Sequence, residues 1–228
     1  MSAAVKLTDV AMQFAVAKQH EGGHHRVLQG LTLEIQRGEK VGLIGRNGAG
    51  KSTLLRIIAG IFPPASGDVW RNPEMTVALL SLGLGFKSDL TGRENAFLAA
   101  MLQGLTRGAA NKHMGAIGDF AELGDYYDEP VKTYSAGMRA RLGFATGLLL
   151  ETDILLLDEI LAVGDNQFRL KARQALQEKV TEDRTIVMVH HAERAIRDMC
   201  TRAVWLEQGR VQMDGDVDAV LEAYGKAV

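Results

Sequence analysis

The chain has 228 residues and a formal net charge of −2, with 46% hydrophobic and 24% charged residues. This balance is ordinary for a globular protein and excludes a global positive field for binding nucleic acid, so we expect no nucleic-acid partner. Cys200 is the single cysteine, which excludes disulfides within the chain. No apolar segment approaches the roughly 20 residues that span a bilayer, so we expect membrane contact only through a partner.

Two strands are predicted first, at residues 5–14 and 28–35, and they form a hairpin. The polar loop between them, at 19–25, contains His20, His24 and His25. These histidines suggest a metal site, but no carboxylate or cysteine supports ligand geometry, so we interpret the segment as a solvated loop.

Residues 45–52 read Gly-Arg-Asn-Gly-Ala-Gly-Lys-Ser, a complete phosphate-binding loop. An apolar run at 40–44 predicts a strand before it, and residues 53–59, closed by Gly60, predict a helix after it. The glycines let successive backbone N–H groups converge on phosphate oxygens, and the helix N-terminus adds a favourable dipole. Lys51 can then reach the β- and γ-phosphates, while the Ser52 hydroxyl can ligate Mg²⁺. The predicted nucleotide-binding residues of this loop are Gly45, Arg46, Asn47, Gly48, Ala49, Gly50, Lys51, Ser52 and Thr53.

Helical patterns dominate the middle of the chain, after a stretch of loop and short strand at 61–90. Residues 91–94 predict a capping box in which Thr91 caps a helix and Glu94 reaches back. Ala96, Phe97, Ala100 and Met101 then share one helix face. This section has little strand character, which predicts a helical subdomain inserted into an α/β core.

A second possible part of a nucleotide site follows the apolar run at 154–157, which predicts a strand buried on both faces of a parallel sheet. Asp158 and Glu159 stand at its end. Asp158 would hold Mg²⁺, and Glu159 would position and polarise an attacking water. Acids at a strand end are also common as surface caps, but their place downstream of a phosphate loop favours the catalytic interpretation.

Two further features could face phosphate. Ser135 is a good N-cap for a helix at 136–150, and small residues after it leave backbone amides open to an anion. An ordinary capped helix is the alternative. His190 and His191 follow a strand predicted at 185–189, where an imidazole can donate a hydrogen bond to the γ-phosphate or simply be exposed.

Strands and helices alternate through the rest of the chain, with helices predicted at 168–180, 193–200 and 217–224 and a hairpin at 203–213 around Gln208-Gly209. Such alternation around a phosphate loop predicts an α/β fold with a mainly parallel sheet. The ligand is expected at the carboxyl ends of the strands.

The order of these elements resembles the nucleotide-binding subunit of ATP-binding cassette transporters, over nearly the whole chain. The resemblance implies one domain over residues 1–228, with a P-loop ATPase core, an N-terminal antiparallel β subdomain and a helical subdomain at about 86–150. It implies ATP and Mg²⁺ as cofactors, with Ser52 and Asp158 holding the metal ion. It further implies that Phe14 stacks on adenine and that Lys51, Glu159 and His191 are catalytic.

The resemblance also implies how copies assemble. Ser135, Ala136, Gly137 and Met138 match the family's signature motif, usually Leu-Ser-Gly-Gly-Gln, with Ala and Met as departures. Asp165 matches the acid of the family's D-loop. In that family two subunits sandwich two ATP molecules head to tail, so a homodimer bound to two permease subunits at the cytoplasmic face of the inner membrane is implied. The family's Gln-containing loop should fall near residues 80–88, which contain no glutamine.

Four short segments together resemble one branch of this family, the ATPases that export bacterial O-antigen, capsule and teichoic acid. They are residues 82–86 (Leu-Gly-Leu-Gly-Phe), 90–95 (Leu-Thr-Gly-Arg-Glu-Asn), 134–138 (Tyr-Ser-Ala-Gly-Met) and 162–165 (Ala-Val-Gly-Asp). The branch implies ATP hydrolysis that powers export of a lipid-linked surface polysaccharide. The ATPase of a drug or lipid exporter is the alternative interpretation. A soluble cassette acting on ribosomes or DNA is disfavoured by the single cassette and the net charge. A GTPase is disfavoured because Asn111-Lys112-His113-Met114 lacks the final Asp.

Overall fold

The computed structural model describes residues 2–15, 24–80, 85–150, 152–158, 165–181, 184–190 and 192–227. The chain forms two compact units. The first unit combines residues 1–75, 154–158 and 183–228, and the second combines residues 76–153 and 159–182. The first unit is therefore assembled from three separate stretches of sequence.

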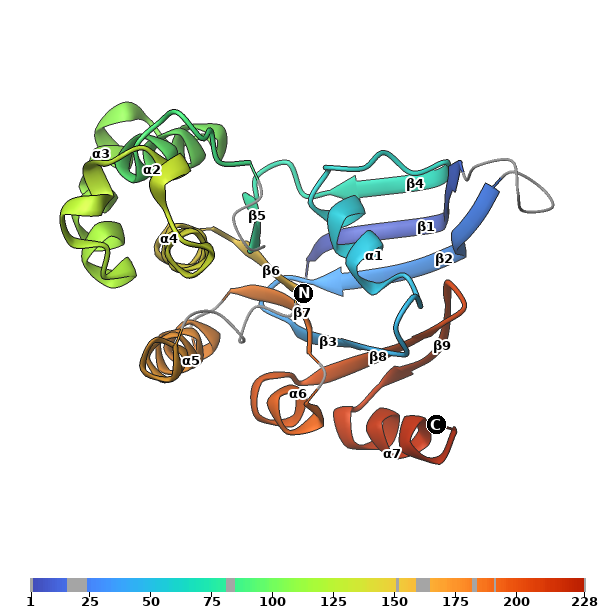
Figure 1. Cartoon of the computed structure of the whole chain (residues 1–228). Helices are drawn as coiled ribbons and strands as arrows, with labels where there is room; N and C mark the ends of the chain where they lie inside the picture. The colour runs from blue at the N-terminus through green and yellow to red at the C-terminus, as the bar shows by residue number, and fades with distance from the viewer. Residues whose placement is uncertain are drawn as a thin grey trace. The chain divides into compact units, whose positions relative to one another are not determined.

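An antiparallel sheet forms one layer of the first unit, from β1 (Ala3–Ala15), β2 (His24–Gln36) and β4 (Ser66–Arg71), which lie side by side in the order β2-β1-β4 (Figure 1). Along β2, Leu31, Leu33 and Ile35 are buried while the residues between them are exposed, as the period of a strand requires. The predicted hairpin is confirmed. The histidine loop is partly corrected, because His24 and His25 belong to β2 and are exposed; His20 lies outside the described residues.

A second sheet contributes five strands to the first unit, in the order β6-β7-β3-β8-β9. Its bounds are β3 (Lys40–Ile44), β6 (Ile154–Asp158), β7 (Thr185–Val189), β8 (Arg202–Glu207) and β9 (Arg210–Gly215). The first four strands in this order run parallel, and β9 is antiparallel to β8. All five residues of β7 and the first four of β6 are buried, as expected for strands covered on both faces. The predicted mainly parallel α/β fold is confirmed.

Helix α1 (Lys51–Ile58) lies between the two sheets, in contact with β4 of one and with β6 and β7 of the other (Figure 1). The helix ends at Ile58, and Gly60 closes it as predicted: Gly60 adopts φ 76°, its amide donates to the Ile57 carbonyl, and the Ile61 amide donates to the Arg56 carbonyl. Arg71 of β4 also donates to two carbonyls of the last turn, at 2.6 and 2.7 Å. The carbonyls at this helix end are thus satisfied, which fixes α1 against β4.

Two more helices complete the first unit, α6 (Glu193–Met199) and α7 (Val217–Ala227). Helix α7 packs on β8 and β9, and α6 packs on β3 at Gly42. A Cβ at Gly42 would lie 2.7 Å from the Ile196 side chain, so the close approach of α6 to β3 requires glycine there. Ring contact between Trp205 and Tyr224, with centroids 5.6 Å apart, holds α7 to β8.

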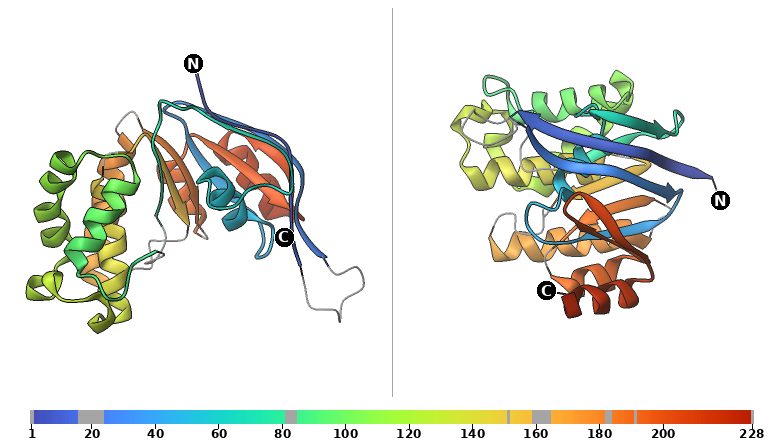
Figure 2. Two further views of the ribbon diagram at one scale, coloured as in Figure 1. Left: turned by 90° about the horizontal axis from the view of Figure 1, so that it is seen from above. Right: turned by 90° about the vertical axis from the view of Figure 1, so that its right-hand side faces the viewer.

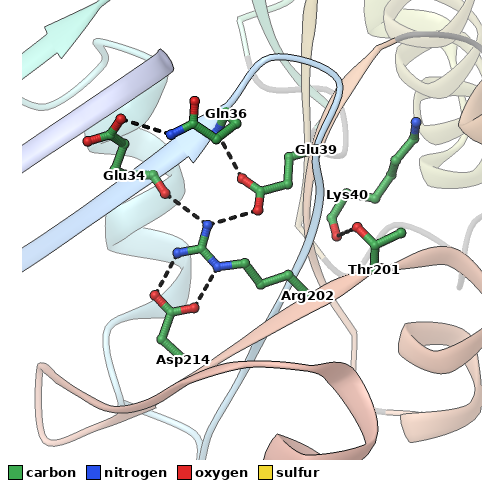
Figure 3. A network of polar contacts seen from close by, with 7 residues as sticks. All are labelled: Glu34, Gln36, Glu39, Lys40, Thr201, Arg202 and Asp214. Carbon is green, nitrogen blue, oxygen red and sulfur yellow. Dashed lines mark hydrogen bonds and ion pairs between the residues drawn. The ribbon is translucent and has the colours of Figure 1, made fainter. Parts of the chain in front are cut away.

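Arg202, the first residue of β8, joins the two sheets through a polar network (Figure 3). Its guanidinium donates two bonds of 2.6 Å to Asp214 of β9, one of 2.9 Å to Glu39 and one of 3.0 Å to the Glu34 carbonyl of β2. The bonds to Asp214, followed by the bond to Glu39, raise the pKa of Arg202. Because Arg202 pairs with Val41 at the start of β3, the network lies at the amino ends of the parallel strands.

The second unit is mainly helical, and Figure 2 shows α2, α3 and α4 gathered together. Its elements are β5 (Val77–Leu80), α2 (Gly92–Leu102), α3 (Arg107–Ala121), short 3₁₀ turns at Gly124–Asp128 and Val131–Thr133, α4 (Ala136–Leu149) and α5 (Asn166–Thr181). The predicted capping box is confirmed, since Thr91 and Glu94 exchange hydrogen bonds of 3.1 and 2.8 Å. Ala96 and Ala100 are buried in the unit's apolar core, whereas Met101 is exposed because it lies at the edge of that face.

Candidate active site

The phosphate-binding loop connects β3 to α1 and leaves no room for side chains at two of its glycines. A Cβ at Gly45 would lie 2.1 Å from the Leu206 carbonyl oxygen, and one at Gly50 would lie 2.7 Å from the Leu28 side chain. Gly48 has φ 83° and nothing within 4 Å of its Cβ position. The loop is thus closely packed on its protein side and open at Gly48, which is the shape that a bound phosphate requires.

Lys51, the first residue of α1, is 7% exposed although it carries a charge. Its ammonium donates to the Gly45 carbonyl at 2.6 Å and to the Arg46 carbonyl at 3.0 Å. Such bonds offset the cost of burying the charge. They also hold the side chain folded along the loop, so the charge and the helix N-terminus act on the same anion position.

Ser52 and Asp158 meet as the sequence predicted for a metal site. The Ser52 hydroxyl donates to the Asp158 carboxylate at 2.9 Å. Asp158 lies opposite Val189 on β7, and Val189 lies opposite Leu43 on β3, so the carboxyl ends of three strands share one edge. Two neighbouring oxygens beside a phosphate loop fit Mg²⁺, a hard cation that prefers oxygen ligands.

Phe14, predicted to stack on adenine, is half-buried near the end of β1. Its ring packs edge to face against Phe62, with centroids 5.8 Å apart, and the Arg56 guanidinium lies 5.8 Å from the centre of the Phe62 ring. Phe62 was not among the residues predicted from the sequence. The signal was a large apolar residue shortly after the predicted helix end at Gly60, where such residues commonly pack back.

The predicted signature and D-loop residues belong to the second unit. The Ser135 hydroxyl accepts a hydrogen bond from the Met138 amide at 3.2 Å, so it caps α4 as expected. Ser135 and Ala136 are exposed, and a Cβ at Gly137 would have only the Ser135 hydroxyl within 4 Å. The Asp165 carboxylate accepts from the Phe168 amide at 2.9 Å, and that bond is the main cause of its lowered pKa.

Several predicted residues lie outside the described part of the chain: Glu159, His191, Ala162, Val163 and Gly164, together with residues 81–84. His190 is described and half-buried. Its Nδ1 accepts a hydrogen bond from the Ala192 amide at 2.9 Å, so a neutral ring carries its proton on Nε2. Among the predicted catalytic residues, the structure therefore describes the surroundings of Lys51.

No group of three or more His, Cys, Asp or Glu side chains among the described residues is arranged to hold a metal ion. None of the described helices combines the length and apolar character needed to cross a bilayer.

Comparison with known proteins gave concordant results. The ABC transporter family matches residues 28–162. The chain is 43% identical to an O-antigen export system ATP-binding protein of Myxococcus xanthus, over 88% of this chain and 46% of that one. It is 40% identical to an O-antigen export system ATP-binding protein of Klebsiella pneumoniae, over 91% of this chain and 84% of that one. It is 39% identical to a teichoic acids export ATP-binding protein of Listeria innocua, over 88% of this chain and 59% of that one.

Solved structures share the fold. An ATP-binding subunit of an ABC transporter aligns with a TM-score of 0.77 and 26% identity, over 97% of this chain and 93% of that one. A dimeric ATP-binding cassette bound to ADP and Pi aligns with a TM-score of 0.76 and 23% identity, over 93% and 98%, which shows the fold alone. The family match covers more than half of this sequence. The chain therefore belongs to the ABC transporter family.

Proposed function

We propose that this chain is an ATP-binding and ATP-hydrolysing subunit that powers export of a lipid-linked surface polysaccharide, of the O-antigen or capsular type, across the bacterial inner membrane. The observation that carries the ATPase part is the 2.9 Å contact between Ser52 and Asp158 beside a phosphate-binding loop. The polysaccharide part is supported by relatives whose names describe O-antigen and teichoic acid export. The Myxococcus relative is longer than this chain, which spans 46% of it.

Each side chain has a distinct role in the proposed reaction. The loop amides and Lys51 hold the β- and γ-phosphates, and Ser52 and Asp158 hold Mg²⁺, which would neutralise charge on those phosphates. Glu159 orients and polarises the attacking water. His191 donates a hydrogen bond to the γ-phosphate. The adenine lies against Phe14, whose ring Phe62 supports at 5.8 Å.

The proposed working form is a homodimer attached to two permease subunits at the cytoplasmic face of the membrane. An exposed helix start attracts anions, and the exposed residues at the beginning of α4 suit the nucleotide of a second copy. Each Ser135 would therefore face the phosphate loop of the partner copy, with Asp165 beside the same interface. Closure on ATP and opening after hydrolysis would move the permease.

Glu159→Gln tests the ATPase mechanism. The variant is expected to bind ATP but not to turn it over, which traps a closed dimer visible by size-exclusion chromatography with ATP. Glu178→Gln, a charge-matched change at an exposed position of α5, is the control and should hydrolyse normally. Normal turnover in Glu159→Gln would contradict the assigned role.

Deletion of the chain in its host tests the cargo. Surface and cytosolic glycans are analysed together, and loss of one surface polymer with its accumulation inside the cell is expected. The chain supplied in trans should restore export, and its Lys51→Ala variant should not. Unchanged glycans would remove polysaccharide as the substrate and favour a drug or lipid exporter.

A further inference from the structure

Three phenylalanine rings, one from each of three helices, meet inside the second unit. Phe120 of α3, Phe144 of α4 and Phe168 of α5 have ring centroids 5.8 to 6.1 Å apart, with Phe168 edge-on to both of the others. Phe168 is 1% exposed. Edge-to-face contacts between buried rings are favourable and directional. The first turn of α5 is therefore fixed against α3 and α4.

Charged side chains close the same junction. Glu122, which follows α3, accepts a hydrogen bond from Lys171 of α5 at 2.7 Å and lies 3.9 Å from the Arg141 guanidinium of α4. Lys171 also donates to the Phe120 carbonyl at 3.0 Å. Arg141 lies over the Phe168 ring, 5.9 Å from its centre. One carboxylate thus bridges cations from two helices, directly over the aromatic contacts.

This junction lies close to Asp165 and to the start of α4, the two segments that the proposed homodimer places at its interface. The Phe168 amide donates to the Asp165 carboxylate at 2.9 Å, so fixing Phe168 also fixes Asp165. Arg141 stands on the helix that Ser135 caps, about 9 Å along its axis from that cap at 1.5 Å per residue. A rigid helix transmits the position of Arg141 to its own start.

We propose that Glu122, Arg141 and Lys171 are positioning residues that hold Asp165 and Ser135 as one rigid pair. The two interface residues then meet the partner copy's nucleotide together. The inference rests on the proposed head-to-tail dimer. The positioning residues do not touch nucleotide themselves and act through the α4–α5 junction.

Mixed dimers test the inference, because the position of a change relative to the working site can be chosen. Two differently tagged copies are purified over both tags, and one copy carries Lys51→Ala, which leaves only the partner's phosphate loop functional. Glu122→Gln is placed either on the Lys51→Ala copy, whose Ser135 serves the working site, or on the copy with the intact loop. We expect about a fivefold loss of ATP hydrolysis in the first placement and no change in the second.

Equal losses in both placements would overturn the proposal, because a general loss of fold affects either copy. No loss in either placement would overturn it as well. Ser135→Ala in the same placements separates this inference from the proposed function. If Ser135→Ala shows no difference between placements, head-to-tail pairing is wrong and both fall. If ATP hydrolysis depends on the placement of Ser135→Ala but not on the placement of Glu122→Gln, only the positioning role is wrong.

A conservative series guards against misfolded variants. Lys171→Arg keeps the charge beside Glu122 and should restore most of the hydrolysis that Lys171→Met loses in the first placement. Phe168→Leu keeps an apolar side chain in the buried site and should show the same dependence on placement. Glu178→Gln, exposed on the same helix, should have no effect in either placement. Equal activity in Lys171→Arg and Lys171→Met would count against the proposal.

Discussion

The starts of α1 and α4 are both proposed to bind phosphate, and the residues around them differ. The start of α1 is enclosed: Lys51 is buried on loop carbonyls and Ser52 bonds to Asp158, all within the first unit. The start of α4 has Ser135 as its cap and is exposed.

The difference indicates separate tasks. A helix start with a lysine and a metal-ligand pair can hold a nucleotide within one copy. In the proposed homodimer, the exposed start of α4, which lacks those groups, would act on the ligand that the other copy brings. Changes at the first start should therefore lower nucleotide affinity, whereas changes at the second should lower turnover and leave affinity intact.

Lys51→Ala should give the largest effect. Loss of a buried donor aimed at developing phosphate charge is expected to lower ATP hydrolysis on the order of 10²- to 10³-fold. Nucleotide affinity should fall with it, measured by titration with a fluorescent ATP analogue. Lys132→Ala, at an exposed surface pair with Asp89, is the control. Wild-type affinity in Lys51→Ala would remove the contrast between the two helix starts.

Arg202→Met should cost the most folding stability. Arg202 is 22% exposed and serves two carboxylates, so its removal leaves partly buried charges without their cation and should lower the free energy of unfolding by about 2–3 kcal/mol. Chemical denaturation measures this loss.

The matched change in the second unit is Arg93→Met. Arg93 also pairs with an aspartate, Asp128, but it is 45% exposed, so the expected cost is within about 1 kcal/mol. Equal losses in the free energy of unfolding would mean that burial does not determine how much these two ion pairs contribute to stability. Nucleotide affinity per folded molecule should be unchanged in both variants.

Ser135→Ala should lower turnover about tenfold, a loss of about 1.4 kcal/mol in transition-state stabilisation, while nucleotide affinity stays near that of the wild type. The lost cap also costs about 1 kcal/mol of stability. Thr106→Ala is a matched control, since Thr106 caps α3 through the Ala109 amide. If Thr106→Ala lowers turnover as much, the effect of Ser135 reflects helix stability rather than contact with nucleotide.

Sequence pattern was most informative where the determinants are local. Strands β3 and β7 have the predicted bounds, and the capping box at Thr91 and the helix end at Gly60 form as expected, because each depends on residues within one or two turns. The phosphate loop could be predicted for the same reason, and the structure places Ser52 and Asp158, the predicted metal ligands, within hydrogen-bond distance of each other.

Contacts between distant residues could not be predicted in this way. Phe120 lies 24 residues before Phe144, and Phe144 lies 24 residues before Phe168, and no period of a helix or strand indicates that their rings meet. Arg202 bonds to Glu39, 163 residues away in sequence. Such contacts depend on how helices and sheets pack against one another, and no regular spacing in a single sequence indicates them.

The last predicted effects appear at alkaline pH, where each unit has a buried acid among its described residues. Burial raises the pKa of the Cys200 thiol in the first unit from 9.0 to about 12, and that of the Tyr127 phenol in the second from 10.0 to about 12. A raised folded-state pKa contributes stability that is complete below the unfolded value and is lost as pH rises through the folded value. The loss should therefore begin near pH 9 for Cys200 and near pH 10 for Tyr127.

Thermal unfolding from pH 8 to pH 11 measures this difference between the units, with Cys200→Ala and Tyr127→Phe as the informative variants. Each variant should flatten its own part of the stability curve, by about 1 to 3 kcal/mol at pH 11, because the unfolded chain no longer gains from ionising that group. At neutral pH, Tyr127→Phe should cost little, since the Tyr127 hydroxyl is buried without a hydrogen-bond partner among the described residues. A native Cys200 that reacts with thiol reagents at pH 8 as fast as the unfolded chain would contradict its burial.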